Sequence, residues 1–169
     1  MMEALSQEQL QLQLRELCGD VFSFSQDNAG MCVAEIPVNQ LYQVVSKLYK
    51  NDSLGFQFLT DICGIHYPDR KGEELCVAYM LHSLVHKTRL RLKVYVPLSK
   101  PELPTLTGIY ASANWMEREN YDFFGLNFLG HPDLRRILNM DEMVDFPMRK
   151  EFPLEDPRRE DKADYQFGR

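Results

Sequence analysis

The sequence has few cysteines, and none of them is spaced for metal binding. Cys18, Cys32, Cys63 and Cys76 form no C-x-x-C pair, and no cluster of cysteine and histidine has the spacing of a zinc finger or an iron–sulfur site. We therefore expect four small, buried or half-buried thiols in a reducing compartment.

The sequence also lacks an apolar run close to the ~20 residues that a membrane-spanning helix needs. Residues 1–17 are rich in glutamine and glutamate, and they contain no basic stretch followed by an apolar one, as a secretory signal would. We expect the protein to stay in the cytoplasm and to reach a membrane only through a partner.

Positive charge is scarce as well. Lysine and arginine number 19 against 25 aspartates and glutamates, which gives a net charge of -6. Because a nucleic-acid-binding protein normally presents a basic face to the phosphates, we expect no nucleic-acid partner. The 169 residues, 44% of them hydrophobic, are enough for one domain with a real core, or for one domain and a tail.

The first half of the chain alternates between helical and strand patterns. Ser6 and Gln9 form a capping box for a helix that ends near Leu17. Residues 21–25 and 31–36 are typical of strands on either side of a turn. Residues 39–50 predict an amphipathic helix that directs Leu41, Val44, Val45 and Leu48 inward.

The next three segments predict strands. Residues 56–67 come first, and residues 75–83 and 88–96 alternate with period two. In the last segment Arg89, Arg91 and Lys93 share one side, which is either a solvated face or a surface for a partner. His66, His82 and His86 are interpreted as isolated surface or turn histidines.

Periodicity ends near residue 141, where prolines and mixed charges begin. A short helical turn is expected at residues 105–110, and an extended tail is expected at the end of the chain. The prediction is a single α+β domain at residues 1–150, with a mainly antiparallel mixed sheet and packing helices, followed by an extended C-terminal tail at 151–169.

Residues 114–138 concentrate charges and aromatic side chains. Asn114 is a suitable N-cap for a helix, and Glu117 is placed to reach back to it. Arg118 and Asp122 are four residues apart and can pair on one helical face. Gly125 is typical of a left-handed helix end.

This charged segment has two interpretations. As a hydrolase site it would use Glu117 or Glu119 with His131 as an acid–base pair. However, the sequence offers no activated nucleophile, no glycine-rich phosphate loop and no metal-ligand spacing. A buried, charge-rich packing element at a subunit boundary is the favoured interpretation, with Arg135 and Arg136 directed to different sides.

The same residues resemble a known family. Residues 117–124 have the sequence Glu-Arg-Glu-Asn-Tyr-Asp-Phe-Phe, six residues separate them from His131, and three more separate His131 from Arg135-Arg-Ile. This pattern is similar to the signature of the C subunit of NADH-quinone oxidoreductase (respiratory complex I), the thirty-kilodalton-subunit family. Further matching segments are Leu59-Thr-Asp-Ile, Arg91-Leu-Lys-Val, Ala113-Asn-Trp, Gly130-His-Pro-Asp-Leu and Pro147-Met-Arg-Lys-Glu-Phe-Pro. Residues 155–169 have no counterpart in the family pattern.

The resemblance implies a non-catalytic subunit in the peripheral arm of a proton-translocating enzyme. Electrons would pass from NADH through FMN and iron–sulfur clusters in other subunits to quinone, and this chain would hold no cofactor. Its partners would be chiefly the D subunit, with the B and I subunits nearby, on the cytoplasmic side of the bacterial inner membrane. The residues expected to serve structure and docking are Glu117, Arg118, Glu119, Asp122, His131, Arg135, Arg136 and Arg149.

Three alternatives remain open at this point. The first is a homologous subunit of a membrane-bound hydrogenase-type complex. The second is a stand-alone module that binds an acidic partner through Arg89, Arg91 and Lys93. The third is a small hydrolase centred on Glu119 and His131, which requires both side chains to face one pocket.

Overall fold

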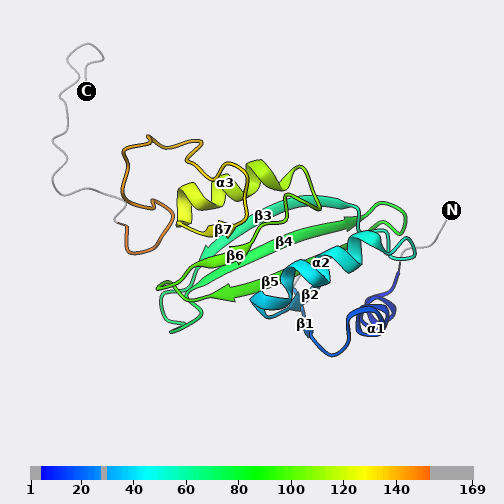
Figure 1. Cartoon of the computed structure of the whole chain (residues 1–169). Helices are drawn as coiled ribbons and strands as arrows, with labels where there is room; N and C mark the ends of the chain where they lie inside the picture. The colour runs from blue at the N-terminus through cyan, green and yellow to red at the C-terminus, as the bar shows by residue number, and fades with distance from the viewer. Residues whose placement is uncertain (1–4, 28–29, 153–169) are drawn as a thin grey trace, which may run out of the picture.

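The computed structural model describes residues 5–27 and 30–152. Its helices and strands form the predicted α+β domain (Figure 1). In chain order they are α1 (Gln7–Cys18), β1 (Ser23–Gln26), β2 (Cys32–Glu35), the 3-10 helix η1 (Val38–Gln40), α2 (Leu41–Lys50), β3 (Phe58–His66), β4 (Leu75–Ser83), β5 (Thr88–Val96), β6 (Glu102–Pro104), α3 (Ala113–Phe124) and β7 (Asn127–Leu129). Residues 153–169 of the predicted tail lie outside the described residues.

Five strands form one sheet in the order β1-β2-β5-β4-β3. Neighbouring strands are antiparallel except β2 and β5, which are parallel. Two short strands, β6 and β7, form a separate parallel pair. The prediction of a mainly antiparallel mixed sheet is therefore confirmed. The period-two pattern of β4 and β5 explains their register, because it places Tyr79 opposite Leu92 on the face that packs against the helices.

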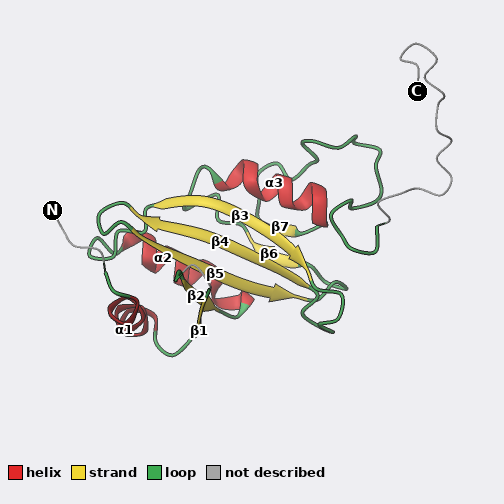
Figure 2. Cartoon of the chain, turned by 180° about the vertical axis from the view of Figure 1, so that it is seen from behind, coloured by secondary structure: helices red, strands yellow, loops and turns green. Residues whose placement is uncertain are grey.

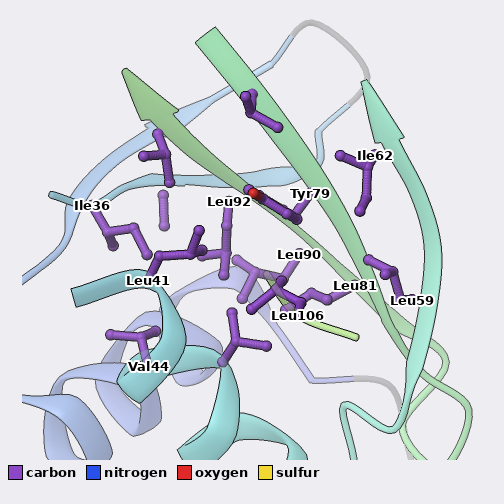
Figure 3. Packing of buried hydrophobic residues seen from close by; sticks show 14 of the residues in the cluster. Ile36, Leu41, Val44, Leu59, Ile62, Tyr79, Leu81, Leu90, Leu92 and Leu106 are labelled. Carbon is purple, nitrogen blue, oxygen red and sulfur yellow. The ribbon is translucent and has the colours of Figure 1, made fainter. Parts of the chain in front are cut away.

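The core lies between this face and the helices. Ser6 and Gln9 form the predicted capping box of α1, which contributes Leu10 and Leu14. The four predicted inward residues of α2 are all buried. Figure 3 shows Leu41 of α2 directed toward the sheet residues Leu90 and Leu92. Hydrophobic burial of this kind is the main force that holds helix to sheet.

α2 covers only one face of the sheet. Figure 2 shows β3, β4 and β5 in front of α2, with their other face turned to the viewer. Arg89, Arg91 and Lys93 alternate with the buried residues of β5 and so lie on this second face. Arg91 Nη1 lies 3.2 Å from Asp27 Oδ2, so this row of cations is partly neutralised within the chain. No helix among residues 5–27 and 30–152 is long and apolar enough to cross a membrane.

Two predictions about single residues are wrong. His66, interpreted as an isolated surface or turn histidine, is buried at the end of β3, where its Nδ1 accepts a hydrogen bond of 2.9 Å from the Lys150 backbone amide. Cys63 was expected to be at least half-buried, but it is exposed, because it lies on the face of β3 opposite the one that α3 covers.

The predicted helical turn at 105–110 is a hydrogen-bonded turn and does not continue as a helix. The backbone amides of Ile109 and Tyr110 both donate to Leu106 O at 2.9 Å. α3 begins three residues later, at Ala113.

Candidate functional site

The candidate site is α3 together with the segment that follows β7. α3 begins at Ala113, and its N-cap is Ser112, whose side chain makes no capping hydrogen bond. The prediction that Asn114 caps the helix is wrong. Asn114 lies inside the first turn, and Glu117 cannot reach back to it because its carboxylate points into the protein.

Glu117 is completely buried and connects α3 to the turn before it. Its Oε1 accepts a hydrogen bond from the Leu106 amide at 2.7 Å, and its Oε2 accepts one from Thr105 Oγ1 at 2.5 Å. Burial raises the pKa of Glu117 to about 7, although the two hydrogen bonds act in the opposite direction. No ion-pair partner for Glu117 is found in the described part of the chain.

α3 is held against β3 by a close approach. Asn120 Nδ2 donates to Ile62 O at 2.8 Å. Gly64 permits this contact, because a Cβ atom at that position would lie 2.6 Å from the Phe124 ring. The helix ends at Gly125 with φ 71° and ψ 30°, which confirms the predicted left-handed end.

Asp122 pairs with Arg136 and not with Arg118, so the predicted pair within the helix is wrong. Arg136 Nη1 lies 2.7 Å from Asp122 Oδ1, and the exposed fractions of the two side chains are 8% and 0%. Asp122 Oδ2 also accepts hydrogen bonds from the backbone amides of residues 137, 138 and 139. Helical spacing allows an Arg118–Asp122 pair, but Asp122 is oriented by the segment that folds back over the helix.

These contacts set the ionisation of Asp122. Burial alone would raise its pKa. The backbone amides of Asn139 and Leu138, the Asn139 side chain and Arg136 outweigh burial and hold the pKa well below its usual range. Glu117 and Asp122 are therefore two buried carboxyl groups of one helix whose surroundings shift their pKa values in opposite directions.

Arg118 lies on the other side of the same segment. Its guanidinium stacks over the Trp115 ring at 5.3 Å and donates to the carbonyl oxygens of Arg135 and Arg136 at 3.3 Å. The Arg135 side chain is 70% exposed and pairs with Asp133 at 3.0 Å. The prediction that Arg135 and Arg136 point to different sides is confirmed.

His131 has a positioning role within the fold. Its Nε2 lies 3.1 Å from Asn114 O, and its Nδ1 accepts from the Asp133 amide at 3.0 Å. Because a carbonyl only accepts, these contacts match the neutral ring with the proton on Nε2. Glu119 is exposed. The two glutamates that could have paired with His131 in a hydrolase site therefore face different surroundings. Glu117 is buried against residues 105 and 106, and Glu119 faces solvent.

Arg149 anchors the end of the described chain to α3. Its Nε donates to Phe124 O at 2.7 Å, and its guanidinium stacks over Phe146 at 4.4 Å. The Met148 amide donates to Phe123 O at 3.2 Å. Residues 141–152, which lack periodicity, thus fold back on their own domain and are not extended away from it.

Three residues that complete this network were not singled out from the sequence. Thr105 binds Glu117, Asn120 binds a carbonyl oxygen of β3, and Asn139 binds Asp122. Each is a small polar residue among other polar or charged residues. No sequence spacing distinguishes such a residue from one that is exposed to solvent. Within the described residues, no group of three or more histidine, cysteine, aspartate or glutamate side chains could hold a metal ion.

Comparisons with known proteins agree with the resemblance seen in the sequence. The family model described as "Respiratory-chain NADH dehydrogenase, 30 Kd subunit" matches residues 34–158. The NADH-quinone oxidoreductase C subunit of Mycolicibacterium gilvum is 44% identical over 120 residues, which are 71% of this chain and 53% of that protein. The NADH-quinone oxidoreductase C 2 subunit of Rhizobium meliloti is 42% identical over 126 residues, or 74% of this chain and 68% of that protein.

Two solved structures have similar folds. The trypsin-resistant fragment of Nqo5 has a TM-score of 0.65 and 35% identity, and the match covers 74% of this chain and 98% of the fragment. A chain of the archaeal membrane-bound sulfane sulfur reductase has a TM-score of 0.75 and 24% identity, covering 94% and 98% of the two chains. At that identity the second likeness shows the fold alone. This chain spans about half the length of the first curated relatives it matches.

Proposed function

Since this chain belongs to the family of the respiratory-chain NADH dehydrogenase 30 Kd subunit, we propose that it is a non-catalytic subunit in the peripheral arm of an NADH:quinone oxidoreductase. In this role it supports electron transfer from NADH to quinone without taking part in it. The observation that carries the proposal is the family match over residues 34–158, which contains the whole α3 site.

The chemistry of the site supports a structural role. The charged groups of the site are bound within the chain: Asp122 binds Arg136, and Arg149 binds Phe124 O. Glu117 binds the Thr105 hydroxyl and the Leu106 amide. A general acid or base must instead reach a substrate within hydrogen-bond distance. Side chains so fully occupied hold the segment after β7 on α3.

The proposal extends to cofactors, partners and location. FMN and the iron–sulfur clusters reside in other subunits of the complex, and the electrons pass there. The D subunit is the chief neighbour, with the B and I subunits nearby. The chain reaches the cytoplasmic face of the bacterial inner membrane only through the complex. As a scaffold it fixes distances between the redox partners.

Purification of a tagged version of this chain from membranes tests the proposal. The expected result is a large assembly that contains a D-subunit homologue and iron–sulfur subunits and that reduces quinone with NADH. A chain that elutes alone on size exclusion would contradict it and favour a stand-alone module. An assembly with a hydrogenase large subunit and no NADH activity would place the chain in the hydrogenase-type complex instead.

A further inference from the structure

Residues 137–145, which we call the 137–145 loop, combine a fixed backbone with outward side chains. The exposed fractions of Leu138, Met140 and Val144 are 64%, 73% and 86%. Isolated apolar side chains on a surface are ordinary, but three of them within seven residues of one loop form a feature that needs an explanation.

The backbone of the loop is fixed at both ends by one buried ion pair. At its start, Asp122 Oδ2 accepts hydrogen bonds from the amides of residues 137–139 at 3.1, 2.8 and 2.9 Å. At its end, Arg136 Nη2 donates to Met143 O at 2.6 Å and to Asp145 O at 3.0 Å. A loop held in this way is already ordered before it meets anything, which lowers the entropy cost of binding.

The charges of the loop have one sign. Asp141, Glu142 and Asp145 are all exposed, and in the described part of the chain no ion pair joins any of them to a cation. Arg136, the cation at the base of the loop, is turned inward. The loop thus presents apolar side chains beside acidic ones.

We propose that the 137–145 loop is a preformed docking surface for another protein subunit of the same complex, one that offers an apolar socket bordered by lysine or arginine. This inference rests on the proposed function and deepens it. A few side chains that fill well-packed, desolvated pockets supply most of the binding energy of an interface. The acidic residues set the orientation and select a basic border, because opposite charges across an interface favour the correct partner.

Site-specific photo-cross-linking in the assembled complex tests this surface. A photo-reactive amino acid is placed at Met140 or at Val144, and at Leu12 of α1 as a control, an apolar side chain that is 60% exposed. We expect positions 140 and 144 to cross-link to one other subunit, next to lysine or arginine, and position 12 to miss that segment. Cross-links only within this chain, only to a second copy, or none in complexes that contain the chain would overturn the inference.

Paired variants measure how much the surface contributes. Met140→Ser with Val144→Ser should lower recovery of the chain in the complex by about tenfold or more, and Asp141→Lys with Glu142→Lys should do the same. The matched controls on α1 are Leu12→Ser and Glu8→Lys, which should leave recovery unchanged. Unchanged thermal unfolding of the full-length variants shows that folding is not the cause. Normal recovery of both loop variants would overturn the inference.

The wild-type chain separates failure of this inference from failure of the proposed function. If the wild-type chain is absent from any complex, both fall. If it is present and the loop positions neither cross-link nor respond to substitution, only the docking surface falls.

Discussion

Arg136 Nη1 lies 2.7 Å from Asp122 Oδ1, and the two side chains are 8% and 0% exposed. This pair joins the third turn of α3 to a segment fourteen residues further along the chain. A buried ion pair does not always add net stability, because both charges lose their hydration. Here it also binds the backbone at both ends of the 137–145 loop, so it determines where that loop lies.

Asp122→Asn should destabilise the protein strongly. The substitution keeps the shape of the side chain but leaves Arg136 buried without its counter-charge, and it turns an amide donor toward the amides of residues 137–139. Loss of one partner of a buried pair costs about 3–5 kcal/mol. Urea unfolding at neutral pH measures the change, with Asp133→Asn as the control. Asp133 pairs with Arg135 at the surface, where such a pair contributes at most about 1 kcal/mol.

The lowered pKa of Asp122 predicts that the folded protein loses stability in acid. The pKa of Asp122 is lowered in the folded state, so its contribution is fully present above its ordinary pKa of about 3.9 and is lost as the pH falls toward the lowered value. Below about pH 4 the wild-type protein should therefore lose stability, and Asp122→Asn should lose less. An equally steep loss in the variant would contradict the assignment.

Glu117 should make the protein less stable as the pH rises, which is opposite to the effect of Asp122, and Glu117→Gln should remove this dependence. Burial raises the pKa of Glu117 from 4.5 to about 7, so between these values the folded protein holds a proton that the unfolded chain releases. Stability should fall across this interval as the pH rises, by roughly 3 kcal/mol at about 1.4 kcal/mol per pH unit. Glutamine carries no charge, and its amide can still accept from the Leu106 amide and donate to the Thr105 hydroxyl, so the variant should show no such fall.

Unfolding by urea at a series of pH values between 4.5 and 8 measures this effect. Glu119→Gln on the exposed side of α3 is the control and should follow the wild-type profile. The Thr105 hydroxyl and the Leu106 amide face Glu117, and buried Tyr79 lies within electrostatic reach of it. Identical profiles for Glu117→Gln and wild type would show that Glu117 does not titrate in this range.

Gly64→Ala should weaken the contact between α3 and β3. The added Cβ would lie 2.6 Å from Phe124 Cδ2 and 2.7 Å from Asn120 Oδ1, closer than such atoms approach one another. Overpacking of this kind costs typically about 1–3 kcal/mol. Gly108→Ala is the control, since its Cβ would meet only the Tyr42 hydroxyl at 3.7 Å. Equal unfolding midpoints for the two variants would contradict the close approach.

The sequence predicted those elements whose pattern is local. The capping box at Ser6 and the alternation of residues 75–83 and 88–96 gave α1, β4 and β5 with their inward faces. Gly125 gave the end of α3. These features depend on neighbours within a few residues, which the chain itself displays.

The partners of the charged side chains could not be predicted in this way. Arg118 and Asp122 have the spacing of a helical pair, yet Asp122 binds Arg136 across fourteen residues, and Arg118 binds the carbonyl oxygens of residues 135 and 136. His66 is buried by residue 150, which is 84 positions away. Such contacts depend on how the segment after β7 folds over α3, and no periodicity records that path.

Substitutions of the adjacent residues Arg135 and Arg136 should distinguish a role in folding from a role in docking. Arg136→Ala should unfold the base of the 137–145 loop and lower stability, because it leaves Asp122 buried without a cation. Arg135→Ala removes a largely exposed side chain and should leave unfolding unchanged while it reduces assembly. Circular dichroism during heating, compared with the amount of complex recovered from membranes, distinguishes these outcomes. A large loss of stability in Arg135→Ala would contradict the docking role.

The most direct measurement is the rate of quinone reduction by NADH per assembled complex in membranes that carry Arg135→Ala. The proposed scaffold role, in which no step of the reaction passes through this chain, predicts fewer complexes, each with the wild-type turnover. A normal number of complexes that fail to reduce quinone would contradict the proposed function.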